Sequence, residues 1–176
     1  MTLVASKPGE FVRIDVEFVK PFEGKSLVDT LNKQINDPLP SIRSTTPEVP
    51  EALARLKARF KIVVLSNGDP DMLEAAKPYH GIPFDAVISA AAAHAFKPHV
   101  ATYTRAAEIV GVPLDAVVFV ANHAFDCIGA KSAGMHTAFV DRRRRPFGAT
   151  PHQPDLIVAD MTELADVLVG PEAVPS

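Results

Sequence analysis

Several features that would assign this chain to a special class of protein are missing from its sequence. It has a single cysteine, Cys127, which excludes an internal disulfide framework and fits a reducing compartment. No apolar run approaches the roughly 18 residues of a membrane helix, and the N-terminal residues lack the apolar core of a signal peptide. The formal net charge of −3 gives no overall basic field for nucleic acid or anionic lipid. We therefore expect a soluble cytoplasmic protein.

Short apolar runs alternate with helical patterns from Pro47 onward. Such runs are typical of strands that are buried on both faces of a parallel sheet. They cover residues 61–66, 84–89, 116–121, 137–140 and 156–158. Helices are expected from Pro70 to near Gly81 and over residues 99–110, 124–133 and 162–169. This order predicts an α/β fold with a three-layer, doubly wound, mostly parallel sheet. We expect this core over residues 47–170, followed by a tail over 171–176.

The first 46 residues have a different pattern. Between residues 11 and 19 apolar and charged residues alternate, which is the period of a half-exposed strand. A helix capped by Ser26 is expected next, and Pro38 ends it. We interpret residues 1–46 as a separate strand–helix segment that leans on the core.

Polar side chains follow three of the predicted strands, at the points where those strands end. They stand in the stretches LSNGD, FKP with the helix after it, and FVANHAFD, and they are Ser66, Asn67, Lys97, Tyr103, Asn122, His123 and Asp126. Taken singly, each has an ordinary structural interpretation as a turn residue, a helix cap, a solvated lysine or a packed polar group. Because the carboxyl ends of parallel strands meet in one crevice, we expect these groups to converge there.

Three stretches in this order resemble one family of enzymes. VVLSNGDPDML, FKPHVATY and VVFVANHAFDCIGAKSAGMHTAFVDR are similar to the core of the haloacid dehalogenase superfamily, and within it to the type II L-2-haloacid dehalogenases. The resemblance implies a Rossmann-like core and a hydrolase that dehalogenates a small 2-haloalkanoic acid through an aspartyl ester, without a cofactor. Type II relatives are often dimers, so the resemblance also makes a homodimer an expectation.

The resemblance implies roles for individual residues. Ser66 and Asn67 would bind the substrate carboxylate or line the halide side of the site. Lys97 would hold the nucleophilic aspartate and its ester intermediate. Tyr103 would line the pocket, and Asp126 would orient the lysine and the hydrolytic water.

The final motif departs from the family in two places. Asn122 and His123 stand where dehalogenases often have Ser and Asn, which keeps the pocket polar and leaves the identity of the substrate open. Phosphatases of the superfamily hold Mg²⁺ with acidic residues at this strand end, whereas this chain has Ala121 and Asn122. We therefore expect a metal-independent displacement at carbon rather than phosphoryl transfer.

The nucleophile segment and the helical cap of the family are not recognisable in this chain. Asp15 is the candidate nucleophile, but it shares the polar face of its strand with Arg13 and Glu17, and no Gly and Thr follow it. An exposed strand carboxylate is the alternative interpretation. The cap is reduced or absent, and Arg43 is the nearby candidate for its halide-binding arginine.

Two other classes of function stay open. The chain would be a weak or inactive relative if it kept an anion-binding crevice without turnover. It would be an interaction module if residues 11–19 paired with the sheet edge of another subunit. The four arginines at 142–145 are interpreted as a solvated loop, and Cys127 as a packed residue.

Overall fold

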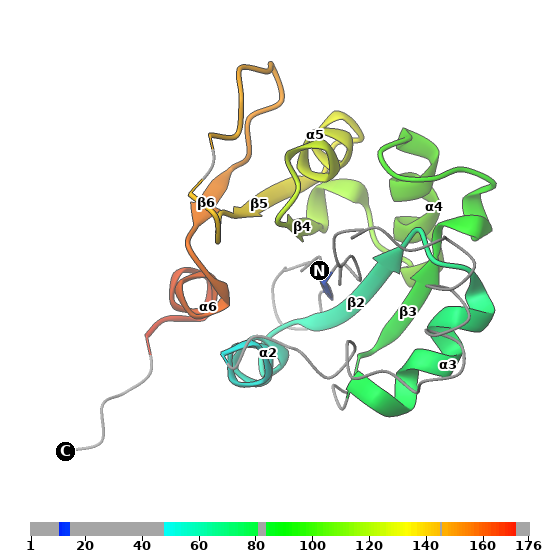
Figure 1. Cartoon of the computed structure of the whole chain (residues 1–176), viewed down its shortest axis with the longest axis horizontal. Coiled ribbons are helices and arrows are strands. Elements are labelled where there is room, and N and C mark those ends of the chain that lie inside the picture. Colours follow the sequence, from blue (N-terminus) through cyan, green and yellow to red (C-terminus); the bar gives the residue numbers. More distant parts are fainter. Residues whose placement is uncertain (1–10, 15–47, 81–83, 145, 172–176) are drawn as a thin grey trace, which may run out of the picture.

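The computed structural model describes residues 11–14, 48–80, 84–144 and 146–171, and all that follows concerns these residues. Their strands form one parallel sheet of six strands in the order β3-β2-β1-β4-β5-β6 (Figure 1). The strands are β1 (Phe11–Ile14), β2 (Lys61–Ser66), β3 (Ala86–Ser89), β4 (Val118–Ala121), β5 (His136–Val140) and β6 (Leu156–Val158). The expected α/β fold with a doubly wound parallel sheet is confirmed.

Helices cover both faces of this sheet. The α-helices are α2 (Val49–Lys57), α3 (Pro70–His80), α4 (Val100–Val110), α5 (Ala124–Ser132) and α6 (Met161–Val169), and the 3₁₀ helices are η1 (Ala90–Ala93) and η2 (Leu114–Ala116). Helices α2 and α6 lie together on one face, while α4 and α5 cover the other (Figure 1). None of the helices described above combines the length and the apolar character that a membrane span requires.

Two apolar cores result from the alternation of side chains along the strands. Ile62 of β2 points into the core beneath α2 and α6, whereas its neighbour Val63 points into the core beneath α4 and α5. In β4, Val120 belongs to the first core and Phe119 to the second. Strands with helices on both faces need apolar residues at consecutive positions, which explains the continuous apolar runs of the sequence.

Helix ends follow the local signals in the sequence. Helix α3 begins at Pro70, whose fixed φ suits the first turn of a helix. Helix α4 ends at Val110 and is capped by Gly111, which adopts a φ of 73° that a residue with a side chain rarely takes. The fourth strand begins at Val118 rather than at residue 116, because residues 114–116 form η2.

The position of β1 corrects the interpretation of the N-terminal segment. Phe11–Ile14 pairs in parallel with β2 on one side and with β4 on the other, so these four residues form a central strand of the core sheet. They are neither beside the core nor free to pair with another subunit, because both of their edges are hydrogen-bonded. The sequence placed this strand beside the core because an alternating pattern carries no information about a strand's neighbours in the sheet. The expected helix after Ser26, and the rest of the segment, lie outside the described residues.

Candidate active site

A buried ion pair lies at the carboxyl edge of the sheet. Lys97 follows η1, and Asp126 stands in the first turn of α5, directly after β4. The Lys97 Nζ lies 3.4 Å from Oδ2 of Asp126, and the two side chains are only 6% and 8% exposed. The ammonium also lies 5.9 Å from the centroid of the Phe119 ring, within reach of a cation–π attraction. The structure therefore brings together the two charged residues that the sequence placed after different strands.

The two carboxylate oxygens of Asp126 differ in their hydrogen bonding. The Oδ1 atom of Asp126 is buried and has no hydrogen-bond partner among the described residues. A buried acceptor without a donor is costly, and such a group in a native structure calls for an explanation. Its position near the N-terminus of α5 is favourable for a negative charge. Asp126 can therefore accept one further hydrogen bond in the site.

Asn67 joins the end of β2 to the segment that carries the lysine. Its side-chain Oδ1 accepts a hydrogen bond from the Lys97 backbone N–H at 2.8 Å, and its Nδ2 donates to the Lys97 carbonyl at 3.2 Å. The sequence suggested that this amide contacts the substrate. The structure shows it bound to the backbone of Lys97, and its contact with the substrate stays a prediction.

Ser66, the last residue of β2, shapes the turn that follows. Its Oγ accepts the Gly68 N–H at 3.0 Å, and the side chain is largely buried. On the neighbouring strand, the Oγ of Ser89 donates to the Gly68 carbonyl at 2.7 Å. Sequence reasoning missed Ser89, although its place at the end of a predicted strand was a usable signal.

Tyr103 is fully buried beneath the ion pair. Its hydroxyl donates to the Asp126 carbonyl at 3.1 Å, and its ring packs edge-on against Phe119 at a centroid separation of 5.1 Å. The expected role in lining a pocket does not fit a side chain with no exposed surface. Tyr103 supports the helical turn that carries Asp126.

Gly129 is a second residue that sequence reasoning missed. A Cβ atom at this position would lie 2.6 Å from the Tyr103 hydroxyl and 2.7 Å from the Pro98 carbonyl oxygen. Helix α5 can therefore approach Tyr103 and Pro98 only with a glycine at this position. A glycine inside a helical pattern was the signal, since it costs about 1 kcal/mol relative to alanine and usually has a packing reason.

The remaining candidates lie at the rim or outside the described residues. Asn122 is exposed, and His123 is half-buried with its ring 5.4 Å from that of Phe125. Phe125 is itself 47% exposed. Asp15 and Arg43 lie outside the described residues.

Cys127 follows Asp126 but is not a reactive group in this structure. It is fully buried, and its Sγ lies 3.7 Å from the Ala138 carbonyl oxygen. Burial, followed by the negative charge of Asp126, raises the pKa of this thiol to about 12. The interpretation of Cys127 as a packed residue is confirmed. No cluster of three potential metal ligands occurs within the described part of the chain.

An open parallel sheet with polar groups gathered at its carboxyl edge defines an α/β protein whose site lies beyond the strand ends. The chain belongs to the haloacid dehalogenase-like hydrolases, since the model of this family matches residues 15–134. This match confirms the resemblance drawn from the three sequence stretches.

Individual relatives show which members of this family the chain is similar to. The chain is 44% identical over 98 residues to an (S)-2-haloacid dehalogenase of Xanthobacter autotrophicus, covering 54% of this chain and 38% of that protein. It is 30% identical over 123 residues to an (S)-2-haloacid dehalogenase of Pseudomonas sp. strain YL, covering 68% and 53%. The chain thus spans about half or less of the length of these relatives.

Solved structures agree with the sequence comparison. The L-2-haloacid dehalogenase of Xanthobacter autotrophicus, solved with chloropropionic acid covalently bound, superposes with a TM-score of 0.65 at 32% identity. The alignment covers 74% of this chain and 64% of that one. A dehalogenase solved as an intermediate complex has a TM-score of 0.68 at 28% identity, with 73% and 59% covered.

Proposed function

We propose that this protein converts a small 2-haloalkanoic acid into the 2-hydroxy acid and a halide ion. A carboxylate oxygen of Asp15 attacks C2 of the substrate, and the halide leaves with the electrons of the carbon–halogen bond. Water then attacks the carbonyl carbon of the resulting ester, which releases the hydroxy acid and restores the aspartate. One water molecule is consumed and one proton is released.

The buried Lys97–Asp126 pair is the observation that carries this proposal. An ammonium held away from water stabilises negative charge more strongly than a solvated one, because the surroundings screen it less. Here Lys97 would hold the Asp15 carboxylate and its ester. The Oδ1 atom of Asp126, which has no partner among the described residues, would orient the hydrolytic water.

The place of β1 supports Asp15 as the nucleophile. β1 lies between β2 and β4, the strands that precede Asn67 and Asp126, and Asp15 is the next residue after its last described residue. Residues that follow a central parallel strand are delivered to the carboxyl edge, where Lys97 and Asp126 lie. Ser66, Asn122 and His123 would supply polar contacts to the substrate.

Chloride release from (S)-2-chloropropionate tests the proposal. We expect wild type to release chloride, and we expect Asp15→Asn to lower the rate by on the order of 10³-fold or more. Lys97→Ala is expected to lower it by roughly 10²- to 10³-fold, as for other lost stabilisers of developing charge.

Matched controls separate chemistry from folding. Asp115→Asn removes an exposed carboxylate in η2, and Lys61→Ala removes an exposed ammonium at the amino end of β2. Both are expected to keep the wild-type rate. The proposal fails if wild type releases no halide. A rise in melting temperature with 2-chloropropionate but no halide release would support the binding protein instead.

A further inference from the structure

We propose that Ser89 is a positioning residue of the site, because its hydroxyl holds the bend that follows β2 against the segment that leads to Lys97. Ser89 acts through the residues that it holds. The part of this inference that concerns catalysis rests on the proposed function, in which Ser66 contacts the substrate. The part that concerns the bend stands on the geometry alone.

Two hydroxyls from paired strand ends hold Gly68. Ser66 and Ser89 are the last residues of β2 and β3, and they are partners in the register of these two strands. The Oγ of Ser66 accepts the Gly68 N–H at 3.0 Å, and the Oγ of Ser89 donates to the Gly68 carbonyl at 2.7 Å. The peptide groups on the two sides of Gly68 are therefore each fixed by a side chain from a different strand.

The same Ser89 hydroxyl also begins the segment that leads to Lys97. Its Oγ accepts the Ala91 N–H at 3.2 Å and so caps η1, which ends shortly before Lys97. A hydroxyl has one proton to donate and lone pairs to accept with, so both bonds form at once. One side chain thus bonds to the segment after β2 and to the segment after β3.

These bonds matter because the ladder between the two strands stops at this point. The pairing of β2 with β3 ends at Ser66 and Ser89, so the bonds of Ser89 to Gly68 and Ala91 continue the connection beyond the ladder. A Ser66 hydroxyl that accepts from Gly68 still has its proton to donate to a substrate oxygen. A bend that loosens therefore also loosens this hydroxyl, and a misplacement of about 1 Å in a site can cost about 10²-fold in rate.

A purely structural role is the alternative, in which Ser89 does no more than cap η1. Ser89→Ala removes the bonds to Gly68 and to Ala91. Ser89→Thr keeps the hydroxyl on a β-branched residue that suits a strand. Ser132→Ala is the matched control, because the Ser132 Oγ also donates to a backbone carbonyl, at 2.8 Å, but lies at the end of α5.

The first measurement is hydrogen exchange at the Gly68 and Ala91 amides, followed by NMR. We expect Ser89→Ala to speed exchange at both amides by at least about 10-fold, because Ala91 loses its acceptor and Gly68 loses the bond to its carbonyl. Ser89→Thr and Ser132→Ala should leave both rates near those of wild type. Faster exchange at Ala91 with a wild-type rate at Gly68 would show capping alone and would overturn the proposal.

The second measurement is the kinetics of halide release. We expect Ser89→Ala to raise KM about fivefold, as for the loss of one neutral hydrogen bond, with kcat within about threefold of wild type because Lys97 keeps its ion pair with Asp126. Ser89→Thr should restore KM, and Ser132→Ala should not change it. An unchanged KM in Ser89→Ala, or a KM as high in Ser89→Thr as in Ser89→Ala, would contradict the catalytic part of the proposal.

Two further results keep the test decisive. If Ser89→Ala does not fold, Ser89→Cys takes its place, because a thiol fills nearly the same space but is a weak donor. If wild type shows no turnover, the proposed function fails separately, and the exchange rate at Gly68 alone decides whether Ser89 holds the bend.

Discussion

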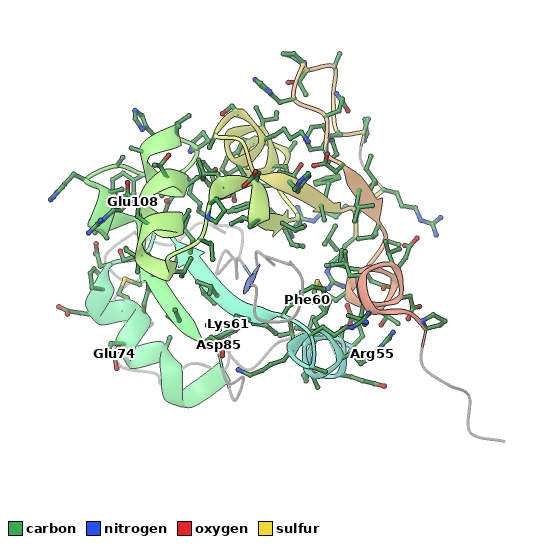
Figure 2. All side chains as sticks on the ribbon, turned by 180° about the vertical axis from the view of Figure 1, so that it is seen from behind. Arg55, Phe60, Lys61, Glu74, Asp85 and Glu108 are labelled. Carbon is green, nitrogen blue, oxygen red and sulfur yellow. The ribbon has the colours of Figure 1, made fainter. Side chains whose placement is uncertain are left out.

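The two ends of the sheet use their aspartates in different ways. At the amino end, each edge strand is preceded by an aspartate, Asp85 before β3 and Asp155 before β6. The carboxylate of Asp85 accepts the Ile62 N–H at 2.6 Å, and its own N–H donates to the Ile62 carbonyl at 2.7 Å. Asp155 makes the same two bonds to Thr137, at 2.7 and 2.9 Å. Figure 2 shows Asp85 close to Lys61, at the start of β2.

A lysine from a neighbouring helix completes each of these amino-end sites. Lys57 of α2 lies 3.3 Å from Asp85, and Lys131 of α5 pairs with Asp155. Both carboxylates are about one-third exposed. They hold the edge strands in register and use both carboxylate oxygens for that purpose.

At the carboxyl end, Asp126 also pairs with a lysine, but its burial and its hydrogen bonding differ from those of Asp85 and Asp155. It is buried, and only one of its oxygens is bonded to the described residues. Asp85 and Asp155 are partly exposed instead, and each uses both oxygens for a backbone N–H and a lysine. Under the proposed function, this difference would leave the Oδ1 atom of Asp126 to orient the hydrolytic water.

Removing the charge of Asp126 should cause the largest loss of stability, and it tests the difference between the two ends of the sheet. We expect Asp126→Asn to lower the free energy of unfolding by about 3 kcal/mol, because it leaves a buried ammonium without its counterion. Asp85→Asn, the isosteric change at the amino end, should cost about 1 kcal/mol or less, since that pair is partly solvated. Urea denaturation at pH 7 measures both.

The same two variants separate stability from activity. Halide release should fall sharply in Asp126→Asn and stay at the wild-type rate in Asp85→Asn, measured where both proteins are folded. Equal losses of stability would show that burial does not distinguish the two ends. A wild-type rate in Asp126→Asn would remove this carboxylate from the chemistry.

Gly129→Ala should have the next largest effect. On an exposed helix position this change would stabilise the helix by up to about 1 kcal/mol, but here the added Cβ meets Tyr103 and Pro98 at less than 3 Å. We expect a net loss of about 1–3 kcal/mol from overpacking, together with slower halide release as α5 shifts. Ser132→Ala, an exposed position of the same helix, should change stability by less than about 0.5 kcal/mol. A stabilised Gly129→Ala would show that α5 moves without cost.

The sequence predicted the elements that local patterns determine. Strand β2 and helix α4 were located to within a residue, because continuous β-branched runs and a glycine stop are local signals. The central position of β1 was missed, since four residues of alternating pattern carry no information about their neighbours in the sheet. Pairing between distant segments is a tertiary property.

The site was predicted at the level of residue types and strand ends. The meeting of Lys97 with Asp126 followed from the geometry of parallel sheets. The bonds of Asn67 and Tyr103 to backbone groups could not be predicted, because a polar side chain at a strand end serves a substrate or a backbone equally well by type. Only the coordinates distinguish these two uses.

The smallest expected effect is a pH dependence at the amino end. Burial alone would raise the pKa of Asp155, but hydrogen bonds from Lys131 and from the Thr137 N–H, with the charge of Lys131, outweigh burial and lower the pKa below its ordinary 3.8. A carboxyl whose pKa is lower in the folded state stabilises the fold above its unfolded value, and this contribution is lost as the pH falls through the folded value.

Asp155→Asn should therefore be less stable than wild type at pH 7, by less than about 1 kcal/mol because the carboxylate is partly exposed. Its deficit should stay constant down to about pH 4 and shrink below that, as wild type itself becomes protonated. Urea denaturation of both proteins at pH 7, 5 and 3 measures this difference. A deficit that grows toward pH 3 would mean that Asp155 does not hold β6 to β5 as a carboxylate, and the contrast between the two ends of the sheet would lose its amino-end half.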